Sequence, residues 1–487
     1  MELTQANVFE TLQKYELAEN HYFQMGGYTI FYNVKQMGVY VIHEEHVRQF
    51  IEFFSGGKNP QQLTKLCDLY GIAQVREDFE ALKNIGLLIS SELISQQGTV
   101  KPPSCHRDRY MSALVVNLCH DCNFRCSYCF ANQGLYRKDR RYMDWKTAKA
   151  TVDFLIAKAN PDMKKKKVRL ELFGGEPLMN MPVIRKLVAY REEVKEKTGF
   201  EIGMSLPTNG LLLTKQRLDF CDEHQIGVQV SIDGPPEIQD RYRKLANGEG
   251  SYAAIIDNVK RLIAKRKKIN ARATIGRNDV HLLEVAKHLI DEVGFASVFI
   301  AESTGVEGCS GTASNTAVDL QEINSQLYDV AEEYIRRARN GEVYNLNPFA
   351  HAVSRLWNPK IKNDACGAGK GYLTVAVDGS LYPCMRFIDM KEYYLGNVFD
   401  GEINEAIRDK FYNNTVDSKE ECSHCWGRYL CGGSCVFLPI EYHGSLDKQP
   451  QEICDTYRRR FECAMYAMAV LHAEGYQLKN NRYVKVI

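Results

Sequence analysis

Cys119-His-Asp-Cys122-Asn-Phe-Arg-Cys126-Ser-Tyr-Cys129-Phe130 is the stretch that decides the fold, and it directly follows a predicted strand at 112–117. Its triplet Cys122, Cys126 and Cys129 has the spacing C-x3-C-x2-C. Three thiolates from one such loop can take three corners of an iron–sulfur cubane, which leaves the fourth iron without a protein ligand. Zinc is the alternative, but zinc favours closed four-ligand sites from paired Cys-x2-4-Cys units. The triplet therefore predicts a cluster with one open iron, and Cys119, outside this spacing, is expected to be a buried thiol.

Strand and helix patterns alternate beyond this loop. The strands recur about every 25–55 residues, a spacing that suits right-handed parallel crossovers. This predicts an α/β fold, either an open doubly wound sheet or an incomplete barrel, and periodicity alone does not choose between them. The expected strands are 112–117, 168–173, 202–206, 228–232, 272–275 and 297–301, and the expected helices include 145–157, 181–196, 253–265 and 281–291.

Composition sets the broader limits. The chain has 487 residues, enough for about three domains. With 45% apolar, 25% charged and 10% aromatic residues it is neither disordered nor fibrous. A formal net charge of +1 provides no overall field for nucleic acid or an anionic membrane, so neither is expected as a partner. We find no secretion signal and no long apolar run, so we expect a cytoplasmic protein whose 16 Cys are metal or cluster ligands rather than disulfides.

The triplet, with the aromatic Tyr128 before its last Cys, resembles the signature of the radical S-adenosylmethionine (SAM) superfamily. The segment Phe173-Gly-Gly-Glu-Pro177 is similar to the GGEP motif of that superfamily, in which Glu176 would accept from the methionine ammonium group. The resemblance implies a partial (β/α)6 barrel and reductive cleavage of SAM to a 5′-deoxyadenosyl radical. It implies SAM contacts from Tyr128, Gly174, Gly175, Glu176, Pro177, Thr208, Ser231, Asp233 and Arg243, with Cys122, Cys126 and Cys129 as the catalytic cluster ligands.

A second cysteine group near the C-terminus resembles the seven-cysteine SPASM domain, which holds two auxiliary iron–sulfur clusters in radical SAM enzymes that modify peptides. By that pattern one cluster would take Cys422, Cys425, Cys431 and Cys454, and the other would take Cys366, Cys384 and Cys435. The resemblance thus implies three [4Fe-4S] clusters in all. The three-ligand cluster is either completed by a distant residue such as Cys309 or Cys105, or its iron is open to a substrate thiolate. Cys463 is expected to be a core residue.

One departure bears on the reaction. In the anaerobic sulfatase-maturing branch of the superfamily an Asp follows the second Cys of this domain as a base, whereas Met385 follows Cys384 here. Formylglycine formation is therefore disfavoured.

The N-terminal part has a different pattern. The runs 28–34 and 39–42 indicate a hairpin, and helical stretches follow at about 44–54, 60–70 and 75–86. This order resembles the winged-helix peptide-recognition element of peptide maturases, whose strand edge captures a leader peptide. A structural cap or a nucleic-acid reader is the alternative, but a clustered basic recognition helix is missing. The segment His21-Tyr-Phe-Gln-Met-Gly-Gly-Tyr28 resembles the maturases that build thioethers in cysteine-rich peptides.

The resemblances imply a radical SAM enzyme that forms Cys sulfur-to-carbon thioether crosslinks in a ribosomally made precursor peptide. Its partners would be that peptide with its leader and a low-potential electron donor such as flavodoxin or ferredoxin. Carbon–carbon crosslinking, epimerisation and formylglycine formation are alternative reactions, and a zinc-binding peptide carrier is the non-enzymatic alternative. The expected domains are a peptide-recognition winged-helix domain at 1–95, a linker at 96–110, the radical SAM partial barrel at 111–315, a helical bridging region at 316–365, and the SPASM domain with its C-terminal helix at 366–487.

Overall fold

The computed structural model describes residues 5–96, 109–136, 139–266, 268–276, 280–303, 317–479 and 482–485. Cys105 and Cys309, considered above as cluster ligands, lie outside these ranges. In the described part of the chain no helix is both long and apolar enough to cross a membrane.

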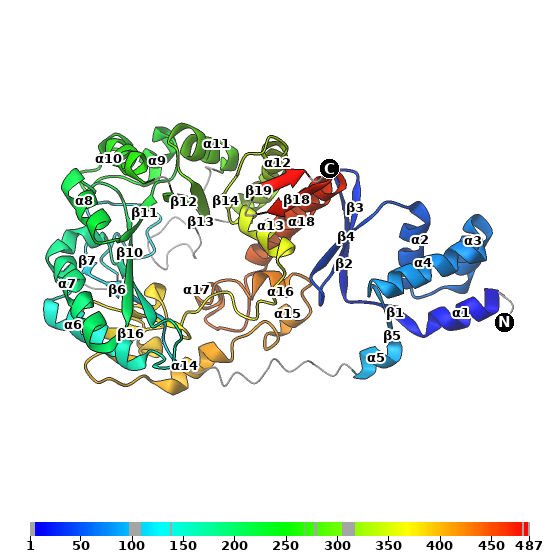
Figure 1. Ribbon diagram of the computed structural model, residues 1–487, viewed down its shortest axis with the longest axis horizontal. Coiled ribbons are helices and arrows are strands. Elements are labelled where there is room, and N and C mark those ends of the chain that lie inside the picture. Colours follow the sequence, from blue (N-terminus) through cyan, green and yellow to red (C-terminus); the bar gives the residue numbers. More distant parts are fainter. Residues whose placement is uncertain are drawn as a thin grey trace.

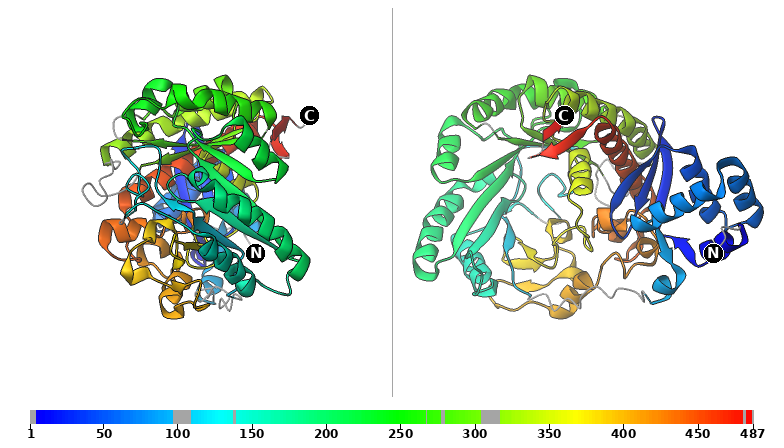
Figure 2. Two further views of the ribbon diagram at one scale, coloured as in Figure 1. Left: turned by 90° about the vertical axis from the view of Figure 1, so that its left-hand side faces the viewer. Right: turned by 45° about the vertical axis from the view of Figure 1, so that its right-hand side comes forward.

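A ten-stranded sheet forms the centre of the molecule and curves into an incomplete barrel with helices on its outer side (Figures 1 and 2). The six strands expected from the sequence are confirmed, and each is parallel to its neighbours. They are β6 (Ala113–Asn117), β9 (Lys167–Phe173), β10 (Glu201–Thr208), β11 (Gly227–Ser231), β12 (Asn270–Ile275) and β13 (Ser297–Glu302).

The helices between these strands follow the predicted periodicity. The Asp144 carboxylate caps the first of them by accepting from the Thr147 N–H at 2.7 Å, and Gly199, with a φ of 75°, ends the next in the left-handed conformation. The expected helix 281–291 instead ends in a short π-helical turn, His288–Glu292. The helices are α6 (Trp145–Lys158), α7 (Met181–Thr198), α8 (Lys215–Glu223), α9 (Pro236–Tyr242), α10 (Tyr252–Lys265) and α11 (Leu282–Lys287).

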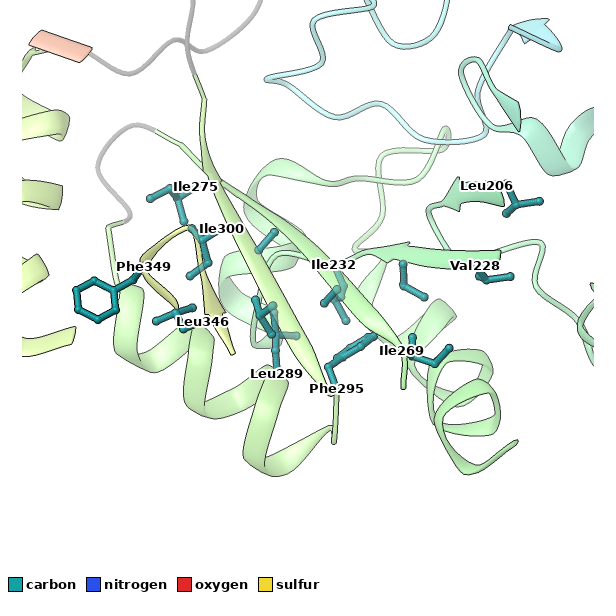
Figure 3. Packing of buried hydrophobic residues seen from close by; sticks show 14 of the residues in the cluster. Leu206, Val228, Ile232, Ile269, Ile275, Leu289, Phe295, Ile300, Leu346 and Phe349 are labelled. Atoms are coloured by element: carbon teal, nitrogen blue, oxygen red, sulfur yellow. The ribbon is translucent and has the colours of Figure 1, made fainter. Parts of the chain in front are cut away.

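Apolar and polar residues alternate along the strands, so one face of the sheet is apolar and buried and the other is polar. In β9, Val168, Leu170 and Leu172 are fully buried, whereas Arg169 and Glu171 are exposed on the other face, inside the barrel. The apolar side chains of the sheet meet those of the surrounding helices, as the labelled isoleucine, leucine and phenylalanine side chains in Figure 3 show. The barrel interior is therefore left polar and open to a ligand.

Segments far along the chain complete the sheet at both edges. β14 (Leu346–Asn347) adds to β13, and β15 (Tyr372–Val375) adds parallel to β6. β16 (Ser380–Tyr382) and β17 (Gly396–Asn397) then extend that edge antiparallel. These strands were not predicted from the sequence: residues expected to be a helical bridge and a SPASM domain contribute four strands to the barrel sheet.

The remaining C-terminal elements surround the open side of the barrel. Two long helices, α12 and α18, pack against each other, and α18 also packs on α13. These elements are α12 (Ala317–Arg339), α13 (Phe349–Trp357), α14 (Glu405–Tyr412), α15 (Glu420–Ser423), α16 (Arg428–Cys431), α17 (Leu438–His443), α18 (Gln451–Ala473), β18 (Tyr476–Lys479) and β19 (Arg482–Lys485).

At the N-terminus a three-stranded antiparallel sheet, in the order β2-β3-β4, is followed by three helices. The hairpin expected at 28–42 is confirmed, and the first strand was not predicted. The elements are α1 (Gln5–Gln13), β1 (Tyr15–Leu17), β2 (Asn20–Met25), β3 (Tyr28–Asn33), β4 (Gly38–Ile42), α2 (Glu45–Ser55), α3 (Pro60–Tyr70), α4 (Ile72–Asn84), β5 (Leu88–Ser90) and α5 (Ser91–Gln96).

This N-terminal sheet lies between its own helices and the C-terminal helix α18 (Figure 1). Phe31 packs in a small core with α2 to α4, whereas Ile30 and Tyr32, its neighbours on β3, belong to the main core that includes the barrel and α18. The His21 ring stacks on the Trp426 ring with centroids 3.9 Å apart. Residues 5–96 are thus built into the rest of the molecule rather than attached through a linker alone.

We expect the ion pair between Glu19 and Arg428 to stabilise this contact. The Arg428 side chain is 6% exposed and its Nη2 donates to Glu19 at 2.6 Å. Glu19→Ala would leave a buried guanidinium unpaired, which costs about 2–4 kcal/mol and should lower the melting temperature by several degrees. Glu474→Ala is the matched control, because it removes an exposed pair with Arg339 that contributes about 0–1 kcal/mol. Equal melting temperatures for the two variants would contradict this role.

Candidate functional site

A cavity of about 300 Å³ lies at the carboxyl ends of the barrel strands. Parallel barrels build their sites at this end because the loops that follow the strands converge there. The cavity brings together most of the residues expected to bind the cluster and SAM. Those residues are Cys122, Cys126, Tyr128, Cys129, Gly174, Gly175, Glu176, Pro177, Thr208, Ser231 and Arg243.

The cysteine triplet lies on a loop that other loops hold in place. The Arg125 N–H donates to the Lys244 carbonyl at 2.7 Å, and the Ser127 N–H donates to the Tyr242 carbonyl at 3.0 Å. Gly175 must be glycine, because a Cβ there would lie 2.0 Å from the Asp121 carbonyl oxygen. The backbone at Gly174 and Gly175 therefore packs directly against the backbone of the segment that leads into the triplet loop. The Cys119 thiol is fully buried and donates to the Glu176 carbonyl at 3.1 Å.

Glu176 lies at the wall of the cavity with 1% of its surface exposed. Its carboxylate accepts from the Thr208 hydroxyl at 3.0 Å, the Asn209 N–H at 2.9 Å and the Leu178 N–H at 3.1 Å. Burial raises its pKa to about 7, and these hydrogen bonds partly oppose that rise. Glu176 thus ties the ends of β9 and β10 together as well as lining the cavity.

Asp233, unlike the other predicted SAM contacts, does not line the cavity and is fully buried. Its carboxylate lies 3.0 Å from the Arg243 Nε and accepts from the Thr274 N–H at 2.8 Å and from the Tyr128 hydroxyl. Asp233 therefore positions Arg243 and Tyr128, which do face the cavity.

Several lining residues were missed. Asn209 donates to Asn123 at 2.7 Å and contacts the Cys122 thiol at 3.7 Å, and it directly follows Thr208, one of the expected SAM contacts. Arg272, inside the barrel on β12, and Met385 and Arg386, from the C-terminal part, also line the cavity. Nothing in the local sequence marks Arg386, because only the pairing of β15 with β6 brings its segment to the barrel.

Cys366, Cys384 and Cys435 form the second thiol set. Burial, together with the nearby thiols of Cys435 and Cys366, raises the pKa of Cys384 to about 12. Cys384 and Tyr136 share a hydrophobic cluster, against which Cys129 of the first triplet and Cys435 pack. The second set is therefore adjacent to the triplet loop.

Cys422, Cys425, Cys431 and Cys454 form the third set and line one small cavity of about 40 Å³. This is the donor set of a closed four-thiolate cluster. Tyr457 of α18 also lines it, and the thiols of both Cys431 and Cys435 lie near its hydroxyl. Tyr457 thus lies between the second and third sets. Within the described ranges no group of three or more His, Cys, Asp or Glu side chains is arranged to hold a single metal ion.

Comparison with known proteins agrees with this arrangement. Residues 116–289 match the radical SAM superfamily, and residues 366–426 match SPASM, an iron–sulfur cluster-binding domain. The cysteine-type anaerobic sulfatase-maturating enzyme of Clostridium novyi is 23% identical over 337 residues, which cover 67% of this chain and 87% of that protein. The serine-type enzyme of Bacteroides thetaiotaomicron is 24% identical over 368 residues, covering 70% and 86%.

Among solved structures, native anSMEcpe with bound AdoMet has the same fold. The TM-score is 0.62 at 22% identity, with 74% of this chain and 98% of that chain covered. The chain thus has an α/β radical SAM fold with a SPASM domain, and its cofactors are SAM and [4Fe-4S] clusters, auxiliary clusters included.

Proposed function

We propose that this radical SAM enzyme modifies a ribosomally made precursor peptide and forms Cys sulfur-to-carbon thioether crosslinks in it. The observation that carries the proposal is the adjacency of the two sites: the cavity with the triplet Cys122, Cys126 and Cys129 lies next to the second set, which has three cysteines within the described residues. A thioether reaction needs both a radical generator and a nearby place for an acceptor sulfur. Peptide and protein maturation is also what the sulfatase-maturating relatives are named for.

The triplet would hold the catalytic cluster, and SAM would bind its open iron within the cavity. When bound, these cofactors supply a 5′-deoxyadenosyl radical. Glu176 would accept from the SAM ammonium group, and Thr208 holds that carboxylate in place. Arg243 and Ser231 would bind the carboxylate and ribose, while Asp233 fixes the orientation of Arg243.

The second and third sets would hold the auxiliary clusters. Forming a thioether removes two electrons and two protons from the peptide. Abstraction of a hydrogen atom accounts for one electron and one proton, and closing the carbon–sulfur bond with loss of the thiol proton releases the second electron, which equals the one used to cleave SAM. The electron would leave through the auxiliary clusters, and the position of Tyr457 between the two sets suits this path. A low-potential donor would supply the electron that starts each turnover.

Formylglycine formation is a second candidate, because two of the relatives perform sulfatase maturation. Met385, which lines the cavity, stands where that branch has its Asp base. A thioether carbon needs no such base after hydrogen abstraction, so Met385 favours the crosslinking reaction.

The N-terminal sheet would bind the leader peptide as an added strand. β4 is an edge strand, and beside it a cavity of about 350 Å³ is lined by Thr29, Val41, Glu45 and Arg48, among others. Backbone hydrogen bonds along this edge would provide the affinity.

Anaerobic reconstitution and mass spectrometry test the proposal. The enzyme should contain about twelve irons for three cubanes and release 5′-deoxyadenosine. Incubated with a Cys-rich precursor peptide, it should remove two hydrogens per crosslink, and replacing the acceptor Cys by Ser should prevent this. Loss of sulfur from the peptide would instead indicate formylglycine formation. A colourless, iron-free protein that binds zinc would overturn the enzyme assignment.

We expect SAM affinity to rise with pH around neutrality. Glu176 has a pKa of about 7, so it is mostly protonated at pH 6 and mostly ionised at pH 8. Since the SAM ammonium group binds the ionised form, affinity should increase about fivefold from pH 6 to a maximum between pH 7 and 8, and should fall above it as the ammonium group loses its own proton. Anaerobic calorimetry measures this change. Glu176→Gln should bind SAM weakly without this rise, whereas Glu171→Gln, another cavity carboxylate, should retain it.

A further inference from the structure

The loop that carries Cys366 folds back so that Tyr372 lies over its start. The Tyr372 N–H donates to the Gly367 carbonyl at 3.2 Å, and Ala368 and Tyr372 form an isolated bridge. The tyrosine ring packs on Gly367, where an added Cβ would lie 3.2 Å from the ring. A Cβ at residue 367 would require the ring to shift by a few tenths of an ångström, so the ring packs closely on Gly367 beside the thiol.

The Tyr372 hydroxyl points to the three-cysteine set. It hydrogen-bonds to the Cys366 thiol, and the Tyr372 side chain packs against the hydrophobic cluster that contains Cys384 and also contacts Cys435. A single oxygen atom therefore lies beside the three thiols, and in the described part of the chain these three are the only cysteines of the second set.

We propose that the phenol oxygen of Tyr372 is the fourth protein ligand of the cluster held by Cys366, Cys384 and Cys435, and that a substrate thiolate displaces it. The inference rests on the proposed function, because it assumes a cluster in this set. Tyrosine oxygen is an established iron ligand in proteins. Thiolate is the softer donor and suits iron–sulfur clusters better, so exchange favours the substrate.

The exchange balances without a redox change. The iron–oxygen bond breaks, an iron–sulfur bond forms, and the proton of the substrate thiol passes to the phenolate oxygen. A substrate thiol could also reach this site. Cys366 is exposed whereas Cys384 is 6% exposed, so the set of thiols is open to solvent on the side where Tyr372 contacts Cys366. The tyrosine would protect the cluster until a peptide arrives.

The test uses the full chain with Cys122, Cys126 and Cys129 replaced by Ala, so that about eight irons of the two auxiliary clusters remain. Tyr372→Phe removes only the oxygen. Tyr382→Phe is the matched control, because Tyr382 lies in the same hydrophobic cluster but its hydroxyl interacts with Asp389. Iron content, electron paramagnetic resonance of the reduced protein, and resonance Raman spectra for a phenolate-to-iron band are recorded without peptide, then with 2-mercaptoethanol.

We expect a phenolate band in the parent protein and in Tyr382→Phe, lost in Tyr372→Phe and on addition of 2-mercaptoethanol. Tyr372→Cys should keep the iron and no longer respond to the added thiol. Full iron with identical spectra in the parent protein and Tyr372→Phe would overturn the proposal while leaving the enzyme assignment intact. If Tyr372→Phe loses about half of the iron and Tyr372→Cys retains all of it, the result supports ligation by residue 372. Loss of iron in both variants would show that Tyr372 only packs in this region, and would overturn the proposal. Absence of iron from the parent protein would refute the proposed function itself.

Discussion

Replacing Cys122, Cys126 or Cys129 by Ala should abolish release of 5′-deoxyadenosine. Each substitution removes one thiolate from the set that lines the cavity at the carboxyl ends of the barrel strands, and a cubane with two ligands on this loop should not assemble. Chromatography of reaction mixtures under dithionite should show loss to background, at least a thousandfold. Iron content should fall by about a third, from about twelve to about eight per chain.

Cys119→Ala is the matched control for this experiment. Cys119 lies on the same segment, but its thiol is fully buried and donates to the Glu176 carbonyl. Losing that bond costs about 1 kcal/mol of stability and no cluster ligand, so SAM cleavage should persist. Near wild-type cleavage by any of the three triplet variants, or its complete loss in Cys119→Ala with the fold intact, would refute the assignment of ligands.

Removing the leader from the precursor peptide should lower kcat/KM for crosslinking by about a hundredfold or more, which corresponds to about 3 kcal/mol of lost binding. Cleavage of SAM without peptide should be unchanged, because the cavity lies in the barrel. Amide hydrogen exchange should show new protection in β4 on adding the leader alone. The opposite edge strand, β2, serves as the internal control. Protection of β2 instead would indicate that the peptide binds at the other edge of the sheet. Protection of neither strand would contradict the proposed role of this sheet in peptide recognition.

Deletion of residues 1–95 would be a poor test of peptide recognition by the N-terminal sheet. Ile30 and Tyr32 are fully buried in the main core, so the truncated protein would expose apolar surface on α18. Loss of activity after that deletion would report a damaged fold as readily as lost peptide binding.

Short sequence patterns correctly predicted the features that depend on neighbouring residues in the chain. The six parallel strands follow from alternating apolar runs, and the cavity residues at their ends follow from motifs within one or two turns of each strand. What the sequence missed depends on contacts between distant segments. The extra strands β14 to β17 are only two to four residues long, too short for a period to be read. Met385 and Arg386 enter the cavity because of those strands.

Motif matching also assigned Asp233 to the ligand, whereas the structure turns it inward. The sequence shows how far Asp233 lies from Ser231 and Arg243 along the chain. The direction of its side chain, however, depends on a hydrogen bond from Thr274, on the next strand. Likewise, no pattern identified Tyr372 as a neighbour of three cysteines, since the back-folding of its loop depends on room at Gly367.

The pairing of β15 with β6 bears on how the molecule forms. Ser112 and Gly371, which join these two strands through a hydrogen bond, are 259 positions apart in the chain. Contacts across so much sequence are slow to close, because loop entropy must be overcome before they contribute. During synthesis the triplet loop emerges long before the strand that shields its side of the barrel, and its thiols stay open to iron delivery and to oxygen over that interval. Cluster assembly on the triplet should therefore precede closure of the sheet, and cells short of iron should accumulate a form of this protein that proteases readily cut.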